Sequence, residues 1–187
     1  LMPNADPLHK VSIIPRGMAL GVTMTLPEED RYLLQKSYVK DELVKMLGGR
    51  VAEDIVFGEV SSGAADDLAR ATDMARKMVR EWGMSDRIGP MAWGSQNQVF
   101  LGDDLMHSRD YSDDTAREID EEVKNILHNQ EDRCRTLLKE NRNALDLIAR
   151  ALLEHETISG EEVMRLTNLA ESTDQSPEPS TEPSHAD

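Results

Sequence analysis

The chain has 187 residues, and its 36 acidic and 21 basic side chains give a formal net charge of −15. This length accommodates one or at most two ordinary domains, and 39% apolar residues suffice for a packed core. A nucleic-acid partner is disfavoured, because neutralising phosphates requires clustered Lys and Arg. The single cysteine, Cys134, excludes an internal disulfide and is expected to pack in the core.

Two short strands are the first elements predicted along the chain. Apolar and β-branched residues gather at positions 11–14 and 20–24, and a turn at Pro15-Arg16-Gly17 separates them. The sequence begins at Leu1 without an initiator methionine, so we expect a fragment whose upstream part is missing. No stretch approaches the roughly 20 apolar residues that span a bilayer, so this fragment is expected to be soluble.

Helices are predicted for most of the following residues. Apolar spacing indicates a helix over residues 28–57, either interrupted once or divided in two, with Gly48-Gly49 as the weak point. A second helix is expected from about Ser62 to Trp82, and Gly83 should end it.

The last third of the chain is also predicted to be helical, after short extended pieces at 91–93 and 99–101. Ser112 is a suitable N-cap for a long helix, and residues 145–152 should form its partner in a helical hairpin. Ser159 and Glu162 form a capping box that opens a last short helix.

The fold class expected from these elements is mainly α, with a small β-hairpin and a C-terminal helical hairpin. We assign residues 1–169 to one domain. From residue 170 the composition becomes acidic and rich in Pro and Ser, so 170–187 is expected to be a disordered tail.

Adjacent aspartates stand at the start of the second predicted helix. Asp66 lies one helical turn before Arg70, on a face of alternating charge where i, i+4 ion pairs are expected. Asp67 lies one turn before Ala71, at the edge of the apolar stripe. A carboxylate there needs a hydrogen bond, an ionic partner or a metal. The alternative for Asp67 is an ordinary helix-start acid that the macrodipole favours.

A second acid stands out on the preceding helix. Asp54 follows Arg50 by four residues, so these two are expected to form an ion pair. Glu53 instead shares a face with Met46 and Gly49. It could serve a polar site together with Asp67, although a structural ion pair is the alternative.

Motifs of self-contained enzymes are missing from the sequence. It has no G-x-x-x-x-G-K-[ST] phosphate loop, no G-x-S-x-G nucleophile turn, and no two histidines at the i, i+4 spacing of a metal site. Any catalysis therefore needs residues from elsewhere.

Several segments, in order, resemble the peptidase domain of the FtsH family of membrane-anchored, ATP-dependent zinc metalloproteases. The resemblance runs from about Pro7 to Leu169 and leaves the tail uncovered. It is carried by residues 7–17, residues 19–23, Gly48-Gly49-Arg50-Val51-Ala52-Glu53, Ser62-Gly63-Ala64 with Asp67-Leu68, and Tyr111-Ser112-Asp113.

The resemblance implies a role in metal binding for one of the aspartates. In that family, two histidines of an HExxH helix and a later aspartate hold the zinc, and the resemblance places this aspartate on Asp67. It places Glu53 beside the zinc, where it would orient a histidine ligand rather than bind the metal. The HExxH helix itself should end a few residues before Leu1. The histidine ligands and the general-base glutamate, and with them every catalytic residue, are then absent from this chain.

The resemblance also implies a substrate-binding strand. Gly21, Val22, Thr23 and Met24 resemble the family's edge strand, whose free backbone groups can pair with an unfolded polypeptide. The alternative is an ordinary sheet edge without a substrate role.

The function expected is that of the C-terminal part of an ATP-dependent zinc metalloendopeptidase that degrades misfolded or short-lived proteins. The resemblance implies Zn²⁺, an AAA+ module that binds ATP and Mg²⁺, unfolded or membrane protein substrates, and a homo-hexamer. It places the parent protein in the inner or cytoplasmic membrane, with the peptidase domain facing the cytoplasm. This fragment alone is expected to be inactive. The alternative is a non-catalytic assembly module from a truncated or degenerate copy.

Overall fold

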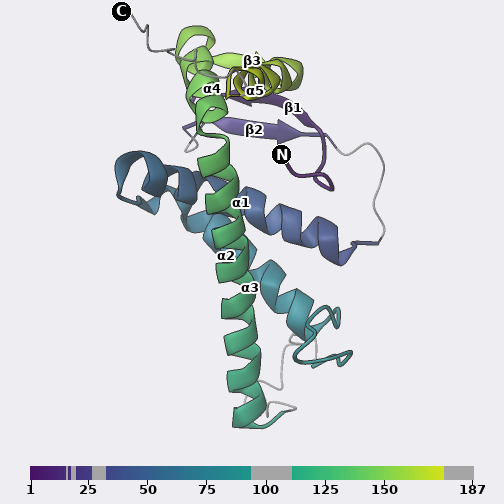
Figure 1. Cartoon of the computed structure of the whole chain (residues 1–187). Coiled ribbons are helices and arrows are strands. Elements are labelled where there is room, and N and C mark those ends of the chain that lie inside the picture. Colours follow the sequence, from purple (N-terminus) through teal and green to yellow (C-terminus); the bar gives the residue numbers. More distant parts are fainter. Residues whose placement is uncertain (16, 18–19, 27–32, 94–110, 175–187) are drawn as a thin grey trace, which may run out of the picture. The chain divides into compact units, whose positions relative to one another are not determined.

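Helices dominate the computed structural model, which describes residues 1–15, 17, 20–26, 33–93 and 111–174 (Figure 1). The chain divides into two compact units, one with residues 1–5 and 31–139 and the other with residues 6–30 and 140–187. The elements in chain order are β1 (Leu8–Ser12), β2 (Val22–Thr25), α1 (Lys36–Phe57), the 3-10 turn η1 (Ser62–Ala64), α2 (Ala65–Arg80), α3 (Asp113–Glu140), α4 (Arg142–His155), β3 (Thr157–Ser159) and α5 (Gly160–Asp174).

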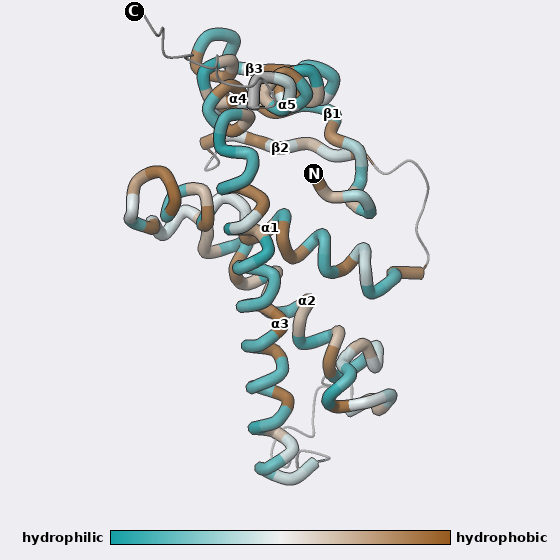
Figure 2. Tube along the Cα trace, in the orientation of Figure 1, coloured by the Kyte–Doolittle hydropathy of each residue, from teal (hydrophilic) through white to brown (hydrophobic). Residues whose placement is uncertain are grey.

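The larger unit is built on α1, α2 and α3, which share one apolar core. Figure 2 shows apolar bands recurring along an otherwise hydrophilic α3, as the sequence spacing predicts. Cys134 of α3 packs with Val44 and Val51 of α1, and burial raises the pKa of its thiol to about 11, which confirms the predicted core position. The main core consists of Val39, Leu43, Met46, Ala71, Ala75, Met78, Val79, Ile88, Ile119, Val123 and Ile126.

Helix α1 continues through the two glycines that were expected to weaken it. Each glycine costs about 1 kcal/mol relative to alanine in a helix interior. Burying one large apolar side chain contributes roughly 1.5–3 kcal/mol, and α1 buries Leu43, Leu47 and Val51 on either side of Gly48-Gly49. Packing therefore outweighs the local preference, and an unbroken helix forms.

The smaller unit contains an antiparallel sheet with the strand order β2-β1-β3. Val11 pairs with Thr23 of β2 and with Ile158 of β3, so β1 is central and β2 is an edge strand within the described residues. The predicted hairpin is thus confirmed, with strand boundaries shifted by a few residues. The third strand was not predicted, because three residues are too few to show an alternating pattern.

Two glycines allow close backbone contacts within this unit. A Cβ on Gly21 would lie 2.7 Å from the Ser12 carbonyl oxygen, and one on Gly160 would overlap the carbonyl oxygen of Leu8. Glycine is therefore required where the hairpin closes and where α5 begins.

Helices α4 and α5 pack together and against β3, so they form the helical hairpin of this unit. The sequence instead predicted that residues 145–152 pair with the helix that precedes them, which is α3. The N-cap predictions are confirmed, because the Ser112 hydroxyl accepts from the Thr115 amide and the Ser159 hydroxyl accepts from the Glu162 amide, both at 3.2 Å. The reciprocal half of the predicted capping box is not found among the described residues, because the Glu162 carboxylate accepts from Arg165 instead.

The first residues of the predicted tail belong to the last helix of the structure. Helix α5 continues to Asp174, and Ala170 is buried, because its small side chain packs within the unit. Residues 175–187, like the extended piece expected at 99–101, lie outside the described residues. Within the described part of the chain, no helix is both long and apolar enough to span a bilayer.

Candidate metal centre

The segment that carries Asp67 runs from the end of α1 to the first turn of α2. Gly58 ends α1 in the left-handed conformation with φ of 69°, and its N–H donates to the Asp54 carbonyl at 3.0 Å. Ser61 then caps the turn η1, which leads directly into α2. Both Asp66 and Asp67 lie in the first turn of α2, where the helix dipole favours negative charge.

The Asp67 side chain is half exposed, with 50% of its surface accessible. Its nearest cation is Arg70, whose Nη1 lies 3.8 Å from Asp67 Oδ1. The expected pairing of Asp66 with Arg70 is therefore wrong, because the arginine reaches back to the acid three residues earlier. Ala71, one turn after Asp67, is fully buried, so Asp67 does lie beside the apolar face, whereas Asp66 is exposed.

Glu53 approaches this segment from α1 through Ser61. Glu53 Oε2 accepts a hydrogen bond from the Ser61 amide at 2.8 Å, and Oε1 accepts one from the Ser61 hydroxyl at 3.0 Å. The same hydroxyl accepts a hydrogen bond from the Gly63 amide at 3.2 Å. Glu53 is thus a hydrogen-bond acceptor for the turn that precedes α2. A structural ion pair, the alternative left by the sequence, is not found for Glu53 among the described residues.

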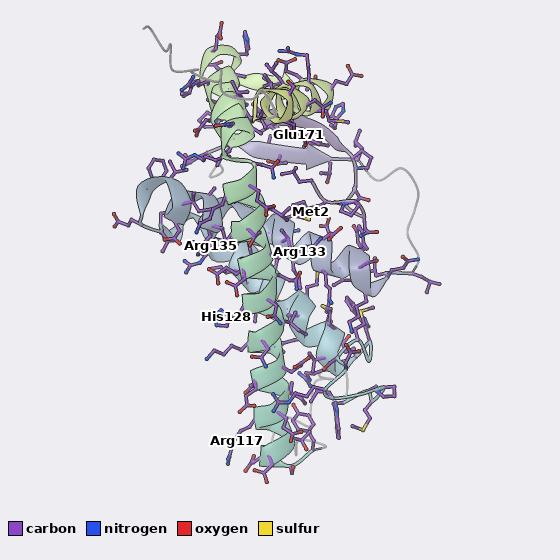
Figure 3. The ribbon with its side chains drawn as sticks, in the orientation of Figure 1. Met2, Arg117, His128, Arg133, Arg135 and Glu171 are labelled. Atoms are coloured by element: carbon purple, nitrogen blue, oxygen red, sulfur yellow. The ribbon has the colours of Figure 1, made fainter. Side chains whose placement is uncertain are left out.

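Asp54 has a different partner from the one predicted. Its carboxylate accepts from Arg135 Nη1 of α3 at 2.6 Å. Figure 3 labels Arg135 on this helix. The prediction of an ion pair with Arg50 is wrong, because helical spacing shows neighbours on α1 but not a residue that reaches it from α3. Arg50 and Asp54 do line the same shallow polar pocket of about 360 Å³.

A second, more apolar groove of about 470 Å³ lies between α1, α2 and α3. It begins beside Leu68, the residue after Asp67, and its apolar surface includes Ala71 and Val123. Polar and charged side chains complete its lining, among them Arg50 and Lys124, together with His128, which Figure 3 labels on α3. The groove therefore offers apolar surface close to the first turn of α2.

The described residues supply one side chain that is suited to bind zinc, the Asp67 carboxylate. A carboxylate oxygen is a common zinc ligand, and zinc can displace a long, exposed contact such as the one between Asp67 and Arg70. In the described ranges, no three His, Cys, Asp or Glu side chains are arranged to hold a metal ion. Asp67 can thus supply one oxygen, and a catalytic zinc site needs about two further protein ligands.

The proposed substrate strand belongs to the smaller unit. Val22, Thr23 and Met24 lie in β2 and are exposed, and Gly21 precedes the strand. Glu53, Ser61 and Asp67 all belong to the larger unit. The structure therefore brings Glu53 to the Asp67 segment, and presents residues 22–24 at a sheet edge of the other unit.

Comparison with known proteins identifies relatives along nearly the whole chain. The model of peptidase family M41 matches residues 1–166. The chain is 59% identical over 170 residues to the ATP-dependent zinc metalloprotease FtsH of Acidimicrobium ferrooxidans, covering 91% of this chain and 26% of that protein.

Proteins with the same name in two other bacteria give similar alignments. The identity is 53% over 167 residues for Nitrosococcus oceani, covering 89% of this chain and 26% of that protein. The identity is 50% over 168 residues for Thermotoga maritima, covering 89% of this chain and 28% of that protein. The chain thus spans about a quarter of the length of the relatives it matches.

Proposed function

Because the chain belongs to peptidase family M41, we propose that it is the peptidase part of an ATP-dependent zinc metalloendopeptidase that degrades misfolded or short-lived proteins. The observation that carries the proposal is 50–59% identity, over about nine tenths of this chain, to proteins named ATP-dependent zinc metalloproteases. The carboxylate of Asp67 in the first turn of α2 supports it, because its chemistry suits a zinc ligand.

Asp67 would supply one anionic oxygen to the zinc, and Glu53 would lie beside the site without binding the metal. Zinc held there would supply the chemistry of peptide hydrolysis, because it would lower the pKa of a water to about 7 and so make a nucleophile available at neutral pH. The sequence contains no HExxH motif. The two histidine ligands and the general base would therefore come from elsewhere in the complete protein.

The complete protein would couple this site to ATP hydrolysis. We propose an AAA+ module that binds ATP and Mg²⁺, a membrane anchor, and a homo-hexameric ring whose peptidase domains face the cytoplasm. The names of the relatives support the ATP dependence, and their greater length leaves room for further domains. Unfolded or membrane proteins would be the substrates, and the apolar groove beside Leu68 offers surface to their exposed apolar side chains.

Removing zinc tests the proposal directly. In the complete protein, a chelator should abolish ATP-dependent digestion of casein, and added Zn²⁺ should restore it, because the proposed peptide hydrolysis would require the metal. ATP hydrolysis should persist, since it does not use this metal. Zinc analysis, casein digestion and phosphate release measure the three quantities. A complete protein that holds no zinc and cuts no casein would instead support the non-catalytic assembly module.

Strand β2 is proposed to hold the substrate through backbone pairing. Proline at Val22, Thr23 or Met24 removes an N–H and disturbs pairing, so at least one of these variants should slow casein digestion while zinc content stays normal. Alanine at the same position keeps the N–H and is the matched control. Gly21 is unsuitable for this scan, because any Cβ there would lie 2.7 Å from the Ser12 oxygen. Normal digestion by all three zinc-replete proline variants would rule out a substrate role.

A further inference from the structure

The connection between α1 and α2 is held by one compact set of hydrogen bonds centred on Ser61. Its hydroxyl donates to Glu53 Oε1 at 3.0 Å and accepts from the Gly63 amide at 3.2 Å. Its amide donates to Glu53 Oε2 at 2.8 Å. Ser61 therefore uses its backbone donor, its side-chain donor and a side-chain acceptor at the same place.

These bonds fix the start of α2 relative to α1. The Gly63 amide lies inside η1, and η1 contacts both helices and passes directly into α2 at Ala65. A Cβ on Gly63 would lie 3.2 Å from the Ser61 hydroxyl oxygen, so a side chain at this position would crowd that atom. The backbone that carries Asp67 is thus tied to the Glu53 carboxylate through two consecutive hydrogen bonds.

We infer that Ser61 is a positioning residue, which acts with Glu53 to set the direction of the Asp67 carboxylate towards the metal. The inference rests on the proposed function, because it takes Asp67 as a zinc ligand. Each Glu53 oxygen has a second lone pair, so its bonds to Ser61 leave room for a further donor at the site. Asp67 itself needs such support from the backbone, because its side chain is half exposed and its contact with Arg70 is long.

The neighbouring serine provides a matched control. Ser62 follows Ser61 directly and both residues are exposed, but the hydrogen bonds to Glu53 and from Gly63 belong to Ser61. Ser61→Ala removes the hydroxyl but keeps the hydrogen bond from the backbone N–H to the Glu53 carboxylate. The variant should therefore loosen the turn without abolishing it. Ser61→Thr retains the hydroxyl and should restore the bonds.

The test measures zinc affinity and amide exchange in the complete protease. Ser61→Ala should weaken zinc binding about 10-fold, as is typical when a residue that supports a metal ligand is lost. It should also speed hydrogen exchange in peptides covering residues 61–68, measured without zinc. Ser62→Ala should match the wild type in both measurements, and Ser61→Thr should recover most of the loss.

The two readouts separate this inference from the proposed function. If Ser61→Ala binds zinc and exchanges as the wild type does, Ser61 has no positioning role and the inference is overturned. Equal losses in Ser61→Ala and Ser62→Ala would overturn it as well, because the effect would then belong to the segment in general. If the wild type holds no zinc while only Ser61→Ala speeds exchange, the proposed function fails, and so does any role of Ser61 towards a metal.

Discussion

Asp67→Asn in the complete protease should lower the zinc content and abolish casein digestion, while ATP hydrolysis persists. Asparagine has the size of aspartate, so the first turn of α2 should keep its structure. It offers a neutral amide oxygen in place of an anionic one, and zinc prefers carboxylate, imidazole or thiolate ligands. Zinc analysis of the purified variant, together with casein digestion and phosphate release, measures the three effects.

Asp66 provides the control for this experiment. It is the adjacent residue in the same turn, with the same charge and the same helix dipole, but it is exposed and Arg70 pairs with Asp67 instead. Asp66→Asn should therefore leave zinc content and proteolysis nearly unchanged. Full proteolysis by Asp67→Asn, or equal losses in both variants, would contradict the assignment of Asp67 as the ligand.

The helices could be predicted from the sequence because their apolar stripes recur over many turns. The spacing of Ala71, Ala75 and Met78 predicts one buried face of α2, and all three residues are fully buried. Ends were less predictable, because α1 starts at Lys36 rather than near residue 28 and continues through its glycines. The start of α1 and its continuation through the glycines depend on packing against other elements. The periodicity of one segment gives no information about that packing.

The candidate site was predictable only in part, for the same reason. The position of Asp67 at the edge of the buried face follows from its spacing to Ala71. The partners of the nearby acids come from other elements: Arg135 of α3 for Asp54, and Ser61 of the loop for Glu53. A serine directly before a helix start is a capping signal, and it could have indicated Ser61. Nothing local indicates the bond to Glu53.

A buried carboxylate that the sequence did not single out, Asp41, should have the largest effect on stability. Its side chain is 1% exposed, and its Oδ1 lies 2.7 Å from Arg133 Nη2 of α3. Its Oδ2 accepts from both the amide and the side chain of Asn4, each at 3.0 Å. Asp41 thus ties the N-terminal segment and α3 to α1, and Figure 3 shows Arg133 on α3.

These contacts also determine how the contribution of Asp41 depends on pH. Burial by itself would raise the pKa of Asp41, but the hydrogen bonds from Asn4 and Arg133 outweigh burial and hold the pKa below its ordinary value. A lowered pKa means that the folded state favours the ionised form. The resulting stabilisation is complete above the unfolded pKa of about 4, and is lost as the pH falls through the lower folded pKa.

Asp41→Ala should lower the free energy of unfolding at pH 7 by about 1.5–3 kcal/mol, the range for losing hydrogen bonds to a charged group. Breaking a fully buried pair costs more, about 3–5 kcal/mol, but Arg133 is 38% exposed and can turn to water.

Urea unfolding measures the change in the free energy of unfolding. Trp82 and Trp93 are the only tryptophans and both lie in the unit that contains Asp41, so their fluorescence reports this unit. Asp86→Ala removes an exposed partner of Lys36 and should have little effect. The difference between the wild type and Asp41→Ala should be smaller in acid, below the unfolded pKa of about 4, than at pH 7, because the folded state loses its preference for the ionised form as the pH falls towards its lowered pKa. An equal difference at both pH values would show that Asp41 acts through packing rather than through its charge.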